Sequence, residues 1–204
     1  NLDSLAPPLP SDFDQSAYRL FENDNSTDVG VPLAAQDTPA TLVNSGAAFR
    51  LRTLINVTAA DLPQNLGNFK LQFAEQSGTC DTAFVGETYI DVTASSAIAY
   101  NNNPAPADAD DLTANVNDPI NGGNTIINQD YEELNNFANS VSAINIGQDG
   151  KWDFSLVDNT APVSTTYCFR MTEASGTLFD TYSVVPQITT GTATGPGGPI
   201  DALR

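Results

Sequence analysis

The segment Thr165-Thr166-Tyr167-Cys168-Phe169-Arg170-Met171-Thr172 alternates between two kinds of side chain. Tyr167, Phe169 and Met171 fall on one side of an extended chain, and this side is apolar. Cys168 and Arg170 fall on the opposite side. A period of two residues is the period of a β-strand. The segment therefore predicts a strand with one apolar face and a cysteine near its middle.

Cys168 can form an intramolecular disulfide only with Cys80, because the chain contains two cysteines. Cys80 comes soon after a second alternating run, Phe69–Glu75. The bond would close a loop of nearly half the chain, and loop-entropy arguments assign such a crosslink about 4–5 kcal/mol. We therefore expect a disulfide between Cys80 and Cys168 and an oxidising compartment.

The chain is strongly acidic, with 25 Asp and Glu residues against 7 Lys and Arg residues, a formal net charge of -18 and no histidine. Nucleic acid is a poor partner for such a chain, because phosphate backbones are neutralised by Lys and Arg. The lack of histidine excludes Ser-His-Asp and Cys-His catalysis and histidine metal ligands. Any two carboxylates could form a glycosidase pair, but the pattern indicates none in particular. We expect neither an enzyme nor a cofactor.

The chain begins with Asn1 and not with Met, and it contains no run of 18 apolar residues. We interpret it as the mature form of an exported protein that does not insert into a membrane. An extracellular position at the cell surface is the expected location.

Further alternating runs predict an all-β protein, a single antiparallel β-sandwich of immunoglobulin-like or jelly-roll type. The predicted strands, besides 165–172, are Ser16–Glu22, Ala48–Thr58, Asn68–Glu75, Phe84–Val92, Val141–Ile146, Lys151–Val157 and Phe179–Thr189.

Two of the connections predict local pairing. The strand 68–75 is expected to form a hairpin with 48–58, and 141–146 is expected to pair with 151–157 around the turn at 147–150. Tyr131, Leu134 and Phe137 have the spacing of one face of a short helix, although an irregular excursion fits equally.

The two ends of the chain differ in composition from its body. Residues 1–16 contain three prolines and form an extended arm, a possible donor strand or simply a disordered leader. The sandwich occupies 17–190, and the Gly/Pro-rich tail at 191–204 reads as a linker. Apolar residues in the arm and the tail are the expected contacts with another subunit: Leu2, Leu5, Leu9, Phe13, Ile200 and Leu203.

Two loops carry oxygen ligands that could surround a calcium ion, although solvated loops are the simpler interpretation and no EF-hand pattern is present. The residues concerned are Asp24, Asn25 and Asp28 in one loop and Asp108, Asp110 and Asp111 in the other. Asn25 and Asn56 fit the N-glycosylation acceptor pattern.

Trp152 alternates with polar residues, so we expect it in the core. The alternative is an exposed platform for stacking a sugar, a role that the loop residues Tyr89, Tyr100 and Tyr131 could share. Arg50 and Arg52 lie on the polar side of their strand and are expected to pair with surface carboxylates.

Five segments together carry a resemblance to a known kind of domain. They are Tyr18-Arg19-Leu20-Phe21-Glu22-Asn23-Asp24, Phe49-Arg50-Leu51-Arg52, Gln72-Phe73-Ala74-Glu75 with Cys80, Tyr167-Cys168-Phe169-Arg170-Met171-Thr172 and Tyr182-Ser183-Val184-Val185-Pro186-Gln187-Ile188. The chain resembles, over roughly residues 17–190, a secreted surface domain that recurs in large exported proteins of candidate-phylum bacteria. The resemblance implies a disulfide-linked, immunoglobulin-like β-sandwich without known enzyme activity.

Three functions fit these features. The first is a structural, fimbrial subunit of an extracellular filament or pilus-like homopolymer, assembled head to tail by strand donation between identical subunits, by analogy with donor-strand pilins and camelysin-type biofilm fibres. The second is an adhesin or carbohydrate-binding module that binds cell-surface glycans. The third is a spacer domain of a larger surface protein.

Overall fold

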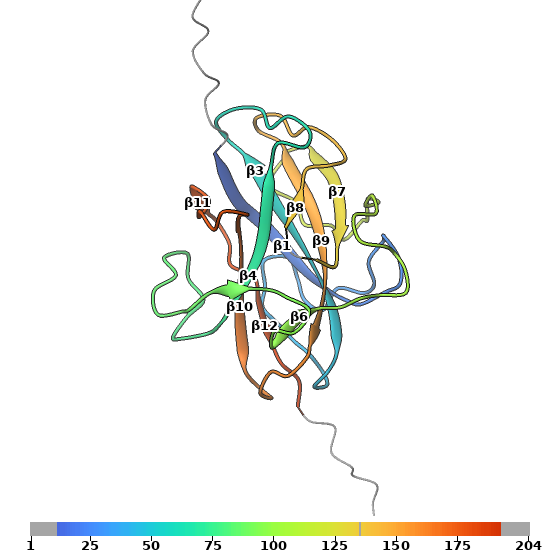
Figure 1. Ribbon diagram of the computed structural model, residues 1–204, viewed down its shortest axis with the longest axis vertical. Helices are drawn as coiled ribbons and strands as arrows, with labels where there is room; N and C mark the ends of the chain where they lie inside the picture. The colour runs from blue at the N-terminus through green and yellow to red at the C-terminus, as the bar shows by residue number, and fades with distance from the viewer. Residues whose placement is uncertain (1–11, 135, 193–204) are drawn as a thin grey trace, which may run out of the picture.

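A computed structural model describes residues 12–134 and 136–192 of the chain. These residues form two six-stranded sheets and no helix, so the predicted all-β sandwich is confirmed. Figure 1 shows that the long strands run roughly along the long axis of the molecule. We call the two layers sheet A and sheet B.

Sheet A has the order β11-β1-β3-β9-β6. β7 lies on the same edge of β9 as β6 and pairs with the part of that edge that β6 leaves free. The central pairs β1·β3 and β3·β9 are antiparallel. The strands are β1 (Phe13–Glu22), β3 (Ala48–Val57), β6 (Ile98–Tyr100), β7 (Ile126–Glu132), β9 (Asp149–Asp158) and β11 (Thr181–Tyr182).

Sheet B has the order β2-β12-β10-β4-β5, and β8 pairs with the beginning of β4. Its central pair β10·β4 is antiparallel and places Phe169 opposite Phe73. The strands are β2 (Ala40–Thr41), β4 (Asn68–Glu75), β5 (Ile90–Asp91), β8 (Phe137–Ala138), β10 (Thr166–Glu173) and β12 (Gln187–Thr189).

The core lies between the sheets and is rich in aromatic side chains. Phe69 is at its centre, because its ring contacts those of Phe13, Phe137, Trp152 and Phe179 at centroid distances of 5.2–5.8 Å. Trp152 is fully buried and donates its indole N–H to a backbone carbonyl at 3.1 Å. The prediction that the single tryptophan is a core residue is confirmed.

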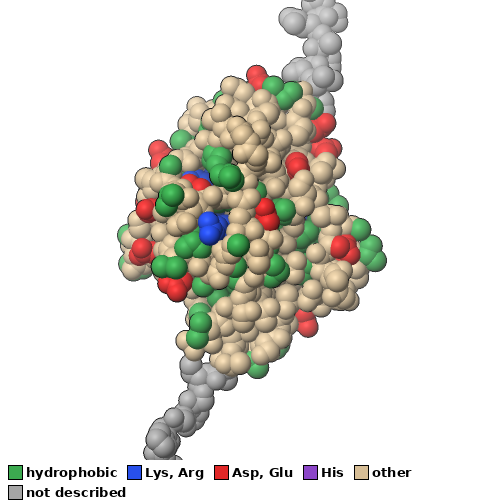
Figure 2. Space-filling model, turned by 180° about the vertical axis from the view of Figure 1, so that it is seen from behind, with side chains coloured by type: hydrophobic (Ala, Val, Ile, Leu, Met, Phe, Trp, Pro, Cys, Tyr) green, Lys and Arg blue, Asp and Glu red, His purple; other side chains and the backbone are tan. Residues whose placement is uncertain are grey.

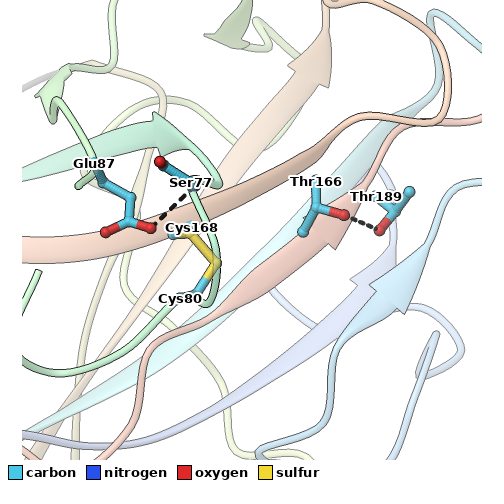
Figure 3. Close-up of a disulfide and its surroundings, with 6 residues drawn as sticks. All are labelled: Ser77, Cys80, Glu87, Thr166, Cys168 and Thr189. Carbon is cyan, nitrogen blue, oxygen red and sulfur yellow. Dashed lines mark hydrogen bonds between the residues drawn. A yellow bond between two sulfur atoms is a disulfide. The ribbon is translucent and has the colours of Figure 1, made fainter. Parts of the chain in front are cut away.

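The disulfide between Cys80 and Cys168 is present, with the Cα atoms 5.5 Å apart (Figure 3). Cys168 alternates with the core residues Tyr167 and Phe169, so it points away from the core. The bond therefore ties β10 to the loop that follows β4, within one layer. In the same loop, the backbone N–H of Ser77 donates to the Glu87 carboxylate at 3.0 Å.

Both predicted hairpins are wrong. β3 and β4 lie in different sheets, because the chain crosses from sheet A to sheet B through residues 58–67. Residues 141–146 form no strand, and only Ile144 makes an isolated bridge, to Leu62. Alternation predicted most of the strands, but it carries no information on which strand lies beside which.

The predicted helical face around Tyr131 is also wrong. Tyr131 lies in β7 of sheet A, whereas Phe137 lies in β8 of sheet B, so the two aromatic residues belong to different layers. The last predicted strand, 179–189, is divided in the same manner into β11 and β12.

The first strand begins at Phe13, so residues 13–16 belong to the sandwich and not to the predicted arm. Phe13 contributes to the core of its own domain and is only 7% exposed, which corrects its assignment as a contact with another subunit. The other expected contact residues lie outside the described residues: Leu2, Leu5, Leu9, Ile200 and Leu203.

We predict that replacing both cysteines, Cys80→Ser with Cys168→Ser, lowers the free energy of unfolding by about 4 kcal/mol, because the closed loop restricts the unfolded chain. Urea unfolding followed by tryptophan fluorescence measures this change. A double variant as stable as the parent would show that the crosslink contributes nothing to the fold.

Candidate functional site

A buried charge cluster covers the outer face of sheet A. We use this name for Arg50, Arg52, Lys151, Asp118 and Asp153. Arg50 and Arg52 project from β3, and Lys151 and Asp153 project from the neighbouring β9. The side chains of these four residues are fully buried, and that of Asp118 is 9% exposed.

Asp153 joins the two arginines. Arg50 donates from Nε and Nη2 to the two carboxylate oxygens at 2.9 and 2.7 Å, and Arg52 donates from Nε at 2.7 Å. Burial alone would raise the pKa of Asp153, but the charges of Arg50 and then Arg52 outweigh it, so the pKa is lowered. The predicted surface pairing of these arginines is therefore wrong, because their main partner is a buried carboxylate.

The cluster also holds two loops against the sheet. Carbonyl oxygens of Asp24 and Ser26 accept from Arg50, each at 3.0 Å, and that of Thr27 accepts from Arg52 at 2.7 Å. Asp118, in a second loop, accepts from Arg52 and from Lys151. Four charged positions on the polar side of two strands are visible in the sequence, namely Arg50, Arg52, Lys151 and Asp153. Asp118 lies in a distant loop and carries no such signal.

A second group of buried carboxyls lies on β7. Asp130 and Glu132 are 1% and 3% exposed. Asp130 accepts from the hydroxyl of Ser140, and its other oxygen has no hydrogen-bond partner in the described chain. Burial, followed by repulsion from Asp108 and Asp130, raises the pKa of Glu132 to about 9. Glu132 therefore keeps its proton at neutral pH.

A shallow pocket of about 340 Å³ opens at the end of the sandwich where β1 stops and β3 starts. We call it the end groove. Its apolar lining includes Leu33, Leu42 and Val43, and Val43 is 79% exposed. The remaining lining residues are Glu22, Asn44, Ala47 and Ala48. The groove adjoins β2, the last strand in the order of sheet B.

The described chain enters and leaves the sandwich at opposite ends. Asp12 lies beside Thr58, at the end of β3, because its carbonyl accepts from the Thr58 N–H at 3.0 Å. Thr192 forms a bridge with Asn44, at the end groove. Figure 1 shows the first strand beginning near the top of the molecule and the last described residues near the bottom.

The residues considered as sugar platforms are mostly inaccessible. Trp152, Tyr100 and Tyr131 are buried in the core or under loops, with exposures of 0%, 6% and 0%. Tyr89 is half-buried and stacks on the guanidinium group of Arg170, whose carbon lies 4.1 Å from the ring centroid. Of the four predicted platforms, only Tyr89 has a partly accessible ring.

The two candidate cation sites do not assemble. Within residues 12–134 and 136–192, no group of three or more acidic or cysteine side chains is close enough to hold a metal ion. Asp24 and Asp28 accept hydrogen bonds from neighbouring backbone N–H groups, and the side chain of Asn25 is in an exposed turn. In the second loop Asp108 and Asp110 likewise accept from backbone N–H groups, while Asp111 forms a bridge with Asp130.

The two glycosylation sequons differ in accessibility. Asn25 is exposed. Asn56 is 8% exposed, and its side-chain N–H groups donate to the Gln148 carbonyl at 3.1 Å and to Asp149 at 3.3 Å. A glycan on Asn56 would displace these contacts in the folded domain, so only Asn25 remains a candidate.

The surface is acidic, although burial removes side chains of both kinds: six acidic residues are buried, namely Asp130, Glu132, Glu133, Asp149, Asp153 and Asp158. Three of the seven basic residues, Arg50, Arg52 and Lys151, are buried. Figure 2 shows, on one face, a few blue basic side chains near the middle and red carboxylates spread around them. Contacts between copies of this protein must therefore overcome repulsion, which salt reduces.

We predict that Asp153→Asn lowers the free energy of unfolding by about 3–5 kcal/mol, because it leaves the buried Arg50 without a counterion and leaves Arg52 with Asp118 alone. The matched control is Asp91→Asn, which removes the partner of Lys70 from a pair with a 38% exposed carboxylate, and about 1 kcal/mol or less is expected there. Denaturant unfolding measures both. Equal losses in the two variants would contradict the role assigned to the cluster.

We predict that Glu132→Gln stabilises the protein at alkaline pH. The pKa of Glu132 is raised in the folded state, from 4.5 to about 9. The folded state therefore holds the proton of Glu132 more tightly than the unfolded state does. The contribution of this proton to the stability of the fold is fully present below pH 4.5 and is lost as the pH rises towards 9. The stability of the variant relative to the parent should rise by up to about 1.4 kcal/mol per pH unit across this range. Thermal unfolding at several pH values measures it, with the exposed Glu75→Gln as control, and a pH-independent difference would contradict the assignment.

No helix among the described residues is both long enough and apolar enough to cross a membrane. The chain matches no protein-family model, no curated protein and no solved structure. Conclusions about function therefore depend on the geometry of this chain alone.

Proposed function

We propose that this protein is a structural subunit of an extracellular filament, assembled head to tail by strand donation between identical subunits. The observation that carries the proposal is the end groove beside the edge strand β2, at the opposite end of the sandwich from Asp12. A contact between unlike ends of a subunit does not close on itself, so it generates a filament. The disulfide is compatible with the oxidising surroundings of a cell surface.

Edge strands invite pairing unless they are covered. The outer edge of β1 is covered by its own chain, through backbone hydrogen bonds from Leu33 to Leu20 and from Asp37 to Tyr18. β2 has no such cover within the described residues, because β12 is its one neighbour in the sheet. A donated strand would satisfy the free side of β2 and cover the exposed side chain of Val43.

The amino-terminal arm has a composition that suits a donor. Residues 1–6 contain Leu2 and Leu5 and no proline, so each backbone N–H can pair with an edge. Pro7, Pro8 and Pro10 lack this donor, so the composition of the stretch that contains them suits a connector better than a paired strand. Residues 7–11 separate this donor segment from Asp12, and fully extended they span about 16–18 Å.

That length favours a neighbouring subunit over the same one. β1 alone is ten residues long, so the two ends of the sandwich are roughly 30 Å apart. The arm would have to run back along nearly the whole sheet to fill the groove of its own domain. In a neighbouring subunit whose end groove faces Asp12, the groove lies close to the start of the arm.

Assembly is tested on the full chain by negative-stain electron microscopy and light scattering at low and high salt. We predict filaments that are more abundant at high salt, and their loss on deletion of residues 1–11, a deletion that leaves β1 intact. Val43→Glu should reduce the polymer by about tenfold or more, since a charge in a buried contact costs well over the 1.4 kcal/mol that corresponds to tenfold.

Val116→Glu is the matched control, because Val116 is 97% exposed and lies in a loop away from the groove. It should assemble like the parent. Filaments formed without residues 1–11 would exclude strand donation by the arm, and a parent chain that stays monomeric at every salt concentration would exclude the filament function itself.

A further inference from the structure

Lys151 and Asp118 form the closest lysine–carboxylate pair among the described residues. The Lys151 Nζ atom lies 2.5 Å from Oδ2 of Asp118. The lysine side chain is 0% exposed and the carboxylate is 9% exposed. The pair connects the central strand β9 with a loop 33 residues away in sequence. No part of the proposed assembly involves it.

The surroundings orient both groups. The Thr113 carbonyl also accepts from Nζ, at 3.1 Å, which fixes the end of the lysine side chain. Arg52 binds Oδ1 of Asp118, the oxygen that Lys151 does not contact. The carboxyl carbon therefore lies between a cation that polarises one oxygen and an amine placed at the other.

The cluster contains three cations and two carboxylates, so one basic group lacks a full counterion. Lys151 is the basic group that loses its proton more readily. Burial, followed by repulsion from Arg52, lowers the pKa of its amine. Arginine cannot lose its proton in a protein, whereas a buried lysine can, and the neutral amine is the nucleophilic form.

We propose that Lys151 and Asp118 condense to form an intramolecular amide bond. A bond forms between Nζ of Lys151 and Cγ of Asp118, and the bond from Cγ to Oδ2 breaks. Oδ2 leaves as water with two of the three ammonium protons, and the third remains on the amide nitrogen. The positive and negative charges cancel, and no oxidant, reductant or other reactant is consumed.

The product keeps two of the hydrogen bonds at the site and loses one, because the Asn115 N–H donates to the departing Oδ2 at 2.8 Å. The remaining amide N–H can still donate to the Thr113 carbonyl, and the amide oxygen takes the place of Oδ1 opposite Arg52. The site excludes bulk water, which disfavours hydrolysis, and it holds the reacting groups in contact, which replaces an encounter between two molecules. The bond would fasten the loop around Asp118 covalently to the centre of sheet A.

The test is the intact mass of the full chain, measured after reduction and denaturation. The mass should be lower than that of the sequence by one water molecule. Peptide mapping should then find one branched peptide that contains both Lys151 and Asp118, uncleaved by trypsin after Lys151. A chain with the full sequence mass overturns the proposal, and so does a water loss that maps to any other pair of residues.

Variants separate this reaction from other dehydrations. Lys151→Arg keeps the charge but not the nucleophilic amine, so it should show the full sequence mass, with circular dichroism confirming the fold. Asp118→Asn should lose ammonia instead of water and converge on the same final mass as the parent. A lighter mass that persists in Lys151→Arg overturns the proposal, and the parent measurement decides the matter even if a variant fails to fold.

Discussion

The carboxylate of Asp153 is the constraint on which the arrangement of this sandwich depends. An antiparallel sheet commonly has one face in water, yet β3 and β9 are buried on both sides. Their outward positions carry cations, and cations can be buried only beside compensating charge. Asp153 supplies that charge to Arg50 and Arg52, and the arginines in turn bind the carbonyl groups of the loop that covers the sheet.

With both faces of the central strands covered, the ends and edges of the sandwich are what remains for contacts with other molecules. The surface is acidic and three of the basic residues are in the interior, so attraction between opposite charges cannot drive assembly of identical copies. Backbone pairing at β2 and burial of apolar side chains in the end groove need no such attraction. This is the physical reason for proposing a subunit contact there.

Alternation predicted the long strands well. In a strand that faces a core on one side, every second side chain points into that core and must be apolar. Trp152 and the Cys80–Cys168 bond were predicted for similarly local reasons, a periodic position and a chain with two cysteines. The hairpin of β3 with β4 failed because a turn-rich connection serves a crossing between sheets as well as a tight turn. The end groove had no signal in the sequence, since its lining comes from segments that meet only after folding.

The sequence by itself determined the class of fold, the disulfide and the residues that face the core, because these follow from periodicity and composition. The tertiary structure decided which sheet each strand belongs to and which charged side chains are buried. Arg50 and Arg52 belong to the polar side of a strand on any reading, and only the loops around Asp24 and Asp118 bury them. A residue's environment depends on what packs over it, and that covering segment can lie anywhere along the chain.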